Sequence, residues 1–169
     1  MNKIIINDKE YVLSDELVEK IAKEMSLQDV STQMPVNLFE RRWDDDYFFI
    51  SSYGVVYKTN DDGINPDNFR FNIANYCRDK VLMEQRALHE TLNRLLWRYS
   101  EMHGGDAPWD GSHIHCMITY SIDKNKVDIT SFWQKKMPGC VYFKDVTIAQ
   151  AAIEEVVKPF LTDHPDFEW

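Results

Sequence analysis

The alternation of hydrophobic and polar residues predicts two β-hairpins in the larger part of the chain. Aromatic and aliphatic residues alternate with polar ones over residues 47–58, and the turn Ser-Tyr-Gly at 52–54 divides this stretch into two strands. A second alternating stretch covers residues 113–134, with a polar turn at 123–126. Each pattern is typical of a strand pair that buries one face.

A long helix is predicted between the two hairpins. Asp79 is a suitable N-cap, and Gly104-Gly105 ends the helix. One apolar stripe lies between these positions and is formed by Val81, Leu88, Leu92, Leu95, Tyr99 and Met102. The second hairpin has a matching apolar strand face, formed by Ile114, Cys116, Ile118, Tyr120 and Ile122. We therefore expect the helix stripe to pack on this strand face.

The remaining segments of this part are shorter. Residues 60–68 are rich in Asp, Asn, Gly and Pro and predict a loop. The alternating apolar residues Phe69, Phe71 and Ile73 predict a brief extended segment. Residues 141–143 predict a short strand. Asp145 is then a suitable cap for a closing helix that starts at Val146.

These patterns predict an α+β fold with three parts. Residues 1–25 form an N-terminal hairpin-helix module, 26–42 form a linker that Pro35 keeps from being helical, and 43–169 form the main domain. In the main domain we expect a small antiparallel sheet of two hairpins, packed against one long and one C-terminal helix.

Composition favours a folded protein of the cytoplasm. The chain has 169 residues, of which 44% are hydrophobic, and contains no apolar run near the roughly 18 residues that a membrane span needs. Its start lacks the apolar core of a signal peptide. The three cysteines stand singly without metal-ligand spacing, so we expect reduced thiols, no structural metal and no cofactor.

Acidic residues are concentrated in two segments. The net charge is −9, and residues 43–79 carry seven acidic against three basic side chains, while 146–169 carry five against one. Such a surface disfavours direct nonspecific binding of nucleic acid and suits docking onto a basic protein surface. The alternative is that the excess of acids serves solubility alone.

The candidate binding residues lie in the first of these segments, except for one tryptophan in the loop after the long helix. They are Asp44, Asp45, Asp46, Asp61, Asp62, Tyr53 and Trp109. The aspartates lie on loops that border one aromatic hairpin, so their fields can add. Their spacing does not match a calcium-binding loop, and we expect no metal there. The aromatic residues either stack on a partner or belong to the core of the sheet.

His113 and His115 are the candidates for catalysis. Residues two apart on a strand point to the same side, as an acid/base pair or a metal pair requires. A metal would need a third ligand, for which His103, Asp106 and Asp110 are nearest in sequence. Phosphoesterases with paired His-x-Thr/Ser motifs need two such strands, and the chain has no second copy. We therefore expect a solvated strand face and no enzymatic activity.

Several segments resemble a family of small accessory proteins encoded by phages and prophages of Gram-positive bacteria. The resemblance covers the aromatic hairpin at 53–57, the stretch 70–77, and residues 139–143 before an Ala-rich helix. The opening 4–11 resembles a module often fused to these proteins. The chain departs from the family at 73–75, where a glycine is usual. The resemblance implies a phage-encoded accessory protein, a class that includes anti-CRISPR and other anti-defence inhibitors, and it supplies no catalytic residues.

Three functions follow as hypotheses. The first is a phage protein that binds and inhibits a host defence protein, such as a CRISPR nuclease, through its acidic and aromatic surface. The second is a small-molecule binder that sequesters a nucleotide signal in a concave pocket, with His113 and His115 in its lining. The third is a phosphodiesterase or nuclease that depends on the same histidines.

Overall fold

The computed structural model describes residues 3–6, 9–12, 14, 16, 20 and 37–169, and the chain divides into two compact units, Met1–Leu38 and Phe39–Trp169. In the first unit, β1 (Lys3–Ile6) pairs antiparallel with β2 (Lys9–Val12), as the sequence predicts. The helix expected after this hairpin, and most of the expected linker, lie outside the described residues. The proposed boundaries at residues 25 and 42 stay predictions.

The second unit begins with the aromatic hairpin. Strand β3 (Asp46–Ile50) pairs antiparallel with β4 (Val56–Asn60), which confirms the hairpin predicted at 47–58. Cys77 extends this two-stranded sheet through two backbone hydrogen bonds with Phe48, at 2.7 and 3.1 Å. We refer to residues 39–79 as the hairpin lobe.

The hairpin lobe also contains a helix that the sequence analysis missed. Helix α2 (Asn65–Asn72) occupies the end of the expected loop and most of the expected extended segment. Pro66 favours helical backbone in its first turn, and the Asp67 carboxylate accepts a hydrogen bond from the Ile64 N–H at 3.2 Å. The alternating pattern was misleading because Phe69 and Ile73 do not face a core and remain 67% and 68% exposed.

Helix α3 (Lys80–Met102) is the long helix predicted from the sequence. Asp79 caps it by accepting a hydrogen bond from the Leu82 N–H at 3.0 Å, and the backbone leaves the helix through Gly104 and Gly105 at positive φ. Both ends therefore lie where the sequence signals place them.

The C-terminal lobe comprises residues 106–169. Strand β5 (His115–Ser121) pairs antiparallel with β6 (Lys126–Phe132), as expected for the second hairpin. The expected strand at 141–143 is reduced to one bridge between Cys116 and Phe143. The closing helix consists of α4 (Val146–Ala152), the π-helical turn η2 (Ile153–Val157) and α5 (Lys158–Asp163). Asp145 caps it as predicted, accepting from the Ile148 N–H at 2.9 Å.

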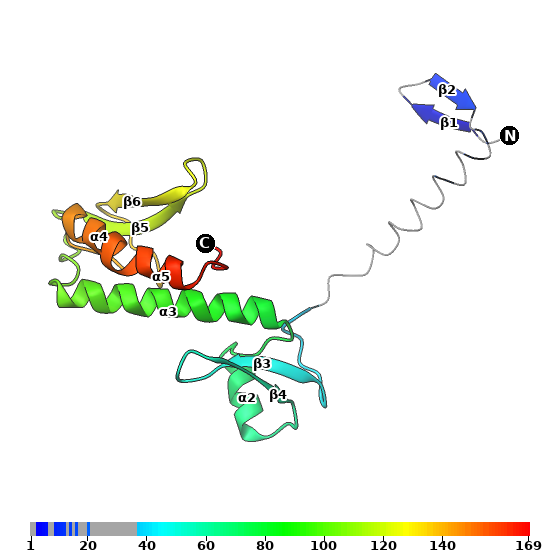
Figure 1. Ribbon diagram of the computed structural model, residues 1–169, viewed down its shortest axis with the longest axis horizontal. Coiled ribbons are helices and arrows are strands. Elements are labelled where there is room, and N and C mark those ends of the chain that lie inside the picture. The colour runs from blue at the N-terminus through cyan, green and yellow to red at the C-terminus, as the bar shows by residue number, and fades with distance from the viewer. Residues whose placement is uncertain (1–2, 7–8, 13, 15, 17–19, 21–36) are drawn as a thin grey trace. The chain divides into compact units, whose positions relative to one another are not determined.

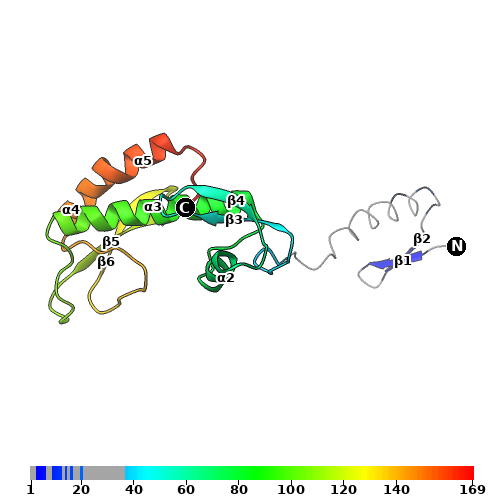
Figure 2. The same ribbon diagram turned by 90° about the horizontal axis from the view of Figure 1, so that it is seen from below.

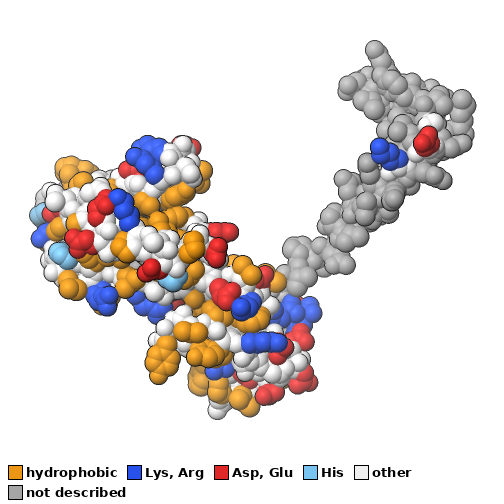
Figure 3. Space-filling model, viewed as in Figure 1, with side chains coloured by type: hydrophobic (Ala, Val, Ile, Leu, Met, Phe, Trp, Pro, Cys, Tyr) orange, Lys and Arg blue, Asp and Glu red, His pale blue; other side chains and the backbone are white. Residues whose placement is uncertain are grey.

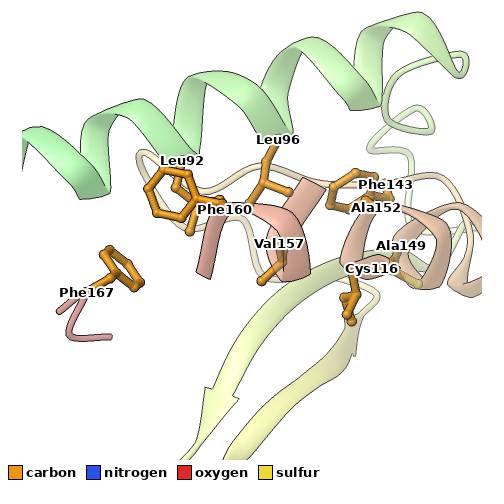
Figure 4. Close-up of a cluster of buried hydrophobic side chains, with 10 residues drawn as sticks. Leu92, Leu96, Cys116, Phe143, Ala149, Ala152, Val157, Phe160 and Phe167 are labelled. Carbon is orange, nitrogen blue, oxygen red and sulfur yellow. The ribbon is translucent and has the colours of Figure 1, made fainter. Parts of the chain in front are cut away.

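The main hydrophobic core lies between α3 and the C-terminal lobe. Figure 4 shows Leu92 and Leu96 on the side of α3 that faces Val157 and Phe160. The buried members of this core are Leu92, Leu96, Cys116, Phe143, Ala149, Ala152, Ile153, Val157, Phe160 and Phe167. Ile118 packs against them. Leu92 and Ile118, at the centre of the predicted contact, therefore belong to one core, but Figure 4 shows the closing helix between α3 and the β5–β6 hairpin.

The ends of that predicted contact are wrong. Val81 and Met102 are 67% and 74% exposed at the two ends of the helix, and Ile122 is 85% exposed at the end of its hairpin. On this side the apolar contacts of α3 run from Leu88 to Tyr99, so Val81 and Met102 lie outside the core.

The second unit confirms the α+β class, with one difference in the sheet. In Figure 1 the hairpin lobe lies on one side of α3, and β5, β6 and the closing helix lie on the other, while Figure 2 gives the view from below. The two hairpins therefore form separate two-stranded sheets, and do not join into the single sheet expected from the sequence. Among the described residues, no helix is both long and apolar enough to cross a membrane.

Candidate binding surfaces

Two acidic loops meet at the open end of the aromatic hairpin. The Asp44 N–H donates to the Asp61 carbonyl at 3.1 Å, and the Asp61 N–H donates to the Asp45 carbonyl at 3.0 Å. The Asn60 amide adds a hydrogen bond to the Asp44 carbonyl at 2.9 Å. The backbone thus holds the two acidic segments side by side, as the sequence-based hypothesis requires.

Asp61 does not belong to the exposed part of this surface, contrary to the prediction. Its side chain is fully buried and accepts two hydrogen bonds from the Arg41 guanidinium, at 2.7 and 2.8 Å, and one from the Gly63 N–H at 3.0 Å. The hydrogen bonds from Arg41 lower the pKa of Asp61, against the opposing effect of burial. Asp61 therefore anchors the loop and is not available to a partner.

The other four aspartates differ in how far their charge is compensated. Asp46 forms an ion pair with Lys58 at 2.6 Å, and Asp45 lies 3.6 Å from Arg78. Asp44 and Asp62 are exposed and form no ion pair with any residue that the structure describes. Two carboxylates consequently carry most of the uncompensated negative charge on these loops.

Trp43 is an exposed aromatic residue beside these carboxylates. Its side chain is 66% exposed and lies directly on Gly63, where an added Cβ would be only 1.8 Å from the indole ring. The guanidinium carbon of Arg41 lies 4.7 Å from the centroid of the Trp43 ring, which is a cation–π arrangement. Contacts with Gly63 and Arg41 thus fix the ring. We call Trp43, Asp44 and Asp62 the acidic edge.

Figure 3 shows acidic side chains along one margin of the hairpin lobe, with Lys and Arg side chains among them and apolar side chains over the adjoining part of the same face. The sequence analysis did not select Trp43, although the string Trp-Asp-Asp-Asp contained the signal: an aromatic residue next to a run of charges. Aromatic residues with a charged rim are typical of protein-binding surfaces.

Tyr53 lies away from the acidic edge. It occupies the turn of the hairpin, whereas the aspartates occupy the open end, and five-residue strands separate the two by about 17 Å. Tyr53 is 88% exposed, so it is free to bind, but not on the same small surface as Asp44 and Asp62.

Trp109 covers a buried histidine. Its indole stacks on the His115 imidazole with ring centroids 3.6 Å apart, and its Nε1–H donates to an Asp106 oxygen at 2.6 Å. The other Asp106 oxygen lies 2.8 Å from Nδ1 of His115. His115 is fully buried, and its Nε2 has no hydrogen-bond partner in the part of the chain that the structure describes. The expectation of a solvated strand face is therefore wrong for His115.

His113 does not share this environment. It precedes strand β5, is exposed, and has its Nδ1 2.9 Å from an Asp110 oxygen. The pKa of Asp110 is lowered, first by the hydrogen bonds from Ser112 and then by His113. The two imidazoles thus differ in exposure and in partner, His113 with Asp110 at the surface and His115 with Asp106 beneath Trp109. Within the described ranges, no group of three or more His, Cys, Asp or Glu side chains is placed to hold a metal ion.

Comparisons with known proteins give no further guide to these surfaces. No protein family, curated protein or solved structure matches the chain.

Proposed function

We propose that the chain is a non-catalytic binding protein whose contact surface is the acidic edge, and that its partner is a protein with a basic surface. The observation that carries this proposal is the fixed, 66% exposed Trp43 next to the uncompensated carboxylates of Asp44 and Asp62. Asp45 and Asp46 border the same surface, with their charges partly compensated.

The two kinds of side chain have different roles in such an interface. An indole that contributes little to the core of its own protein loses little on binding and gains a large buried contact area. Because its orientation is already fixed by Gly63 and Arg41, little conformational entropy is lost on association. The carboxylates accelerate the encounter with a basic partner and orient it.

The resemblance to phage accessory proteins suggests the class of protein to which this basic partner belongs. We propose a host defence protein that handles nucleic acid, such as a CRISPR nuclease, inhibited in the cytoplasm of the host cell. Such enzymes bind phosphate backbones through basic grooves, and an acidic edge of this kind suits the same groove. The acidic C-terminal segment 154–168 adds to the overall negative charge without belonging to the proposed contact.

The experiment compares three forms of the full chain as bait in a lysate of the bacterial host. The baits are the parent protein, Trp43→Ala, and the double variant Asp44→Asn/Asp62→Asn. Asp123→Asn/Asp163→Asn is the matched control, because it removes two exposed carboxylates from the C-terminal lobe. The association rate with any captured protein is then measured as a function of salt concentration.

We expect the acidic-edge double variant to associate on the order of tenfold more slowly at low salt, with the difference shrinking as salt screens the charges. Trp43→Ala should instead raise the dissociation rate. The proposal is wrong if the control pair slows association as much as the acidic-edge pair, or if Trp43→Ala binds like the parent.

A further inference from the structure

A second exposed surface lies where the turn of the aromatic hairpin meets α3. A groove of about 390 Å³ lies between the turn and the helix. Its lining includes Tyr53, Arg94, Trp97 and Arg98. Its volume is within the range of small-ligand sites. The groove lies away from the acidic edge and differs from it in charge.

The turn is rigidly placed over the helix. The Ser51 hydroxyl accepts hydrogen bonds from the N–H groups of Tyr53 and Val55, both at 3.3 Å, and the Gly54 N–H donates to the Ser51 carbonyl at 3.0 Å. Gly54 has a φ of 79°, and a Cβ at this position would lie 3.4 Å from Oγ1 of Thr91. The turn therefore rests on α3 at Thr91, and this contact holds Tyr53 at the groove.

Two aromatic rings in the groove take no part in the core. Tyr53 is 88% and Trp97 60% exposed, although both are residues that usually bury most of their surface. Each has a planar face that a flat ligand can stack on, and neither needs to leave a packed position to do so.

The same groove carries positive charge in a protein of net charge −9. Arg94 and Arg98 are one helical turn apart and so lie on the same face of α3. Arg94 donates to the Glu90 carbonyl at 3.1 Å and lies 3.7 Å from its carboxylate, which Arg86 also contacts. The exposed Arg98 guanidinium has no hydrogen bond or ion pair with any residue that the structure describes. An exposed guanidinium without a partner beside two exposed rings matches a ligand that is both flat and anionic.

We propose that this groove binds a free nucleoside monophosphate, with the base stacked on Trp97 and Tyr53 and the phosphate between Arg94 and Arg98. Guanidinium groups bind phosphate oxygens through paired hydrogen bonds, and aromatic rings stack on any base. A mononucleotide fits better than a nucleic-acid strand, because the groove is small and the net charge of −9 on the whole chain disfavours a polyanion. This site differs from the histidine-lined pocket expected from the sequence, and the proposal does not rest on the acidic edge.

The test is a titration of the full chain by calorimetry and by ¹H–¹⁵N NMR. The probes are AMP, adenosine, inorganic phosphate and a 5′-phosphorylated tetranucleotide. We expect AMP to bind about tenfold or more tightly than adenosine or phosphate alone, with shifts confined to the turn at 52–54 and to residues 91–98 of α3. Equal affinity for AMP and adenosine, no binding of AMP, or tighter binding of the tetranucleotide would each overturn the proposal.

Two substitutions separate the parts of the ligand. Arg98→Gln should reduce the affinity for AMP about tenfold, to that for adenosine, while leaving adenosine binding unchanged. Trp97→Ala should lower the affinity for both AMP and adenosine, because it removes a ring on which the base stacks. Lys135→Gln is the control, because it removes one exposed positive charge outside the groove. If Lys135→Gln lowers the affinity for AMP as much as Arg98→Gln does, the attraction of the phosphate is nonspecific and no phosphate site exists at the groove. Circular dichroism verifies that these exposed positions leave the fold intact.

Discussion

The hairpin lobe buries polar and aromatic side chains, whereas the C-terminal lobe buries mainly apolar ones. The core between α3 and the C-terminal lobe is built from residues such as Leu92, Phe143 and Val157. In the hairpin lobe, Tyr47 stacks on Tyr76 with ring centroids 4.1 Å apart, and its hydroxyl donates to the buried Asp67 at 2.6 Å. The two lobes share α3 but are held together by different kinds of interaction.

The difference explains where the exposed apolar residues lie. A lobe of about forty residues has too little interior for a large apolar core, so hydrogen bonds and ion pairs fix its loops instead. Many of its large apolar side chains are left at the surface, namely Phe39, Trp43, Tyr53, Val55, Tyr57, Ile64, Phe69, Phe71 and Ile73. A rigid backbone with exposed aromatic residues is suited to binding, and both surfaces proposed above include residues of this lobe.

The largest expected loss of stability comes from opening the apolar core. Leu92→Ala should lower the free energy of unfolding by about 2–5 kcal/mol, because Leu92 is 4% exposed and its removal leaves a cavity. Urea denaturation measures this change. Met102→Ala is the control on the same helix, since Met102 was expected to share the buried stripe but is exposed. Similar losses for both variants would mean that the helix is buried along its whole length.

The second prediction concerns the polar interior of the hairpin lobe. Asp61→Asn should cost about 1–3 kcal/mol, because it removes the charged acceptor of the Arg41 guanidinium at a fully buried position. Asp46→Asn, which breaks the exposed pair with Lys58, should have no measurable effect. If the two substitutions are equally mild in urea denaturation, the polar interior does not stabilise this lobe.

The loss at Asp61 should also depend on pH. The hydrogen bonds from Arg41 lower the pKa of Asp61 below its value in the unfolded chain, which is about 3.9. The unfolded state therefore binds the proton more readily, and the stabilisation is complete well above this value and is lost as the pH falls through the lower pKa of the folded state. The difference between parent and Asp61→Asn should be constant from pH 7 to about 5 and shrink below about 4.

Sequence reasoning succeeded where the signals are local. Asp79, Asp145 and Gly104 mark the ends of helices through contacts within a few residues, and the patterns around them predict those ends correctly. The α+β class follows from the order of these elements. The alternation at 69–73 was also a local signal, but it competed with the helix-start signals of Pro66 and Asp67, and the segment is helical.

The sites were harder to predict because their interactions are distant in sequence. Arg41 was assigned to the linker, yet it pairs with Asp61, twenty residues away, and this contact changes Asp61 from a binding residue to a buried one. His115 is covered by the loop that carries Asp106 and Trp109, which lie six or more residues away in sequence. Nothing in the alternation of a strand specifies which of its faces such a loop will cover.

The third prediction tests this buried histidine. His115→Ala should cost about 1–3 kcal/mol, because it removes the ring on which Trp109 stacks and one hydrogen-bond partner of Asp106. His113→Ala should leave stability unchanged, since its ring is exposed. Thermal unfolding compares the two. A neutral His115→Ala would show that the loop carrying Trp109 is held by other contacts.

The smallest effects are expected at the helix caps, and they show whether the two lobes unfold together. Asp79→Ala and Asp145→Ala should each cost about 1 kcal/mol by removing a cap hydrogen bond. Asp145 caps a helix inside the apolar core, so its loss should lower the protection of the whole C-terminal lobe in hydrogen exchange. Asp79 lies where α3 meets the hairpin lobe. If that lobe opens separately, Asp79→Ala should speed exchange in β3, β4 and the first turns of α3 alone. Equal acceleration at every slowly exchanging amide would instead show that the polar lobe and the apolar lobe form one cooperative unit, despite the different interactions that hold them.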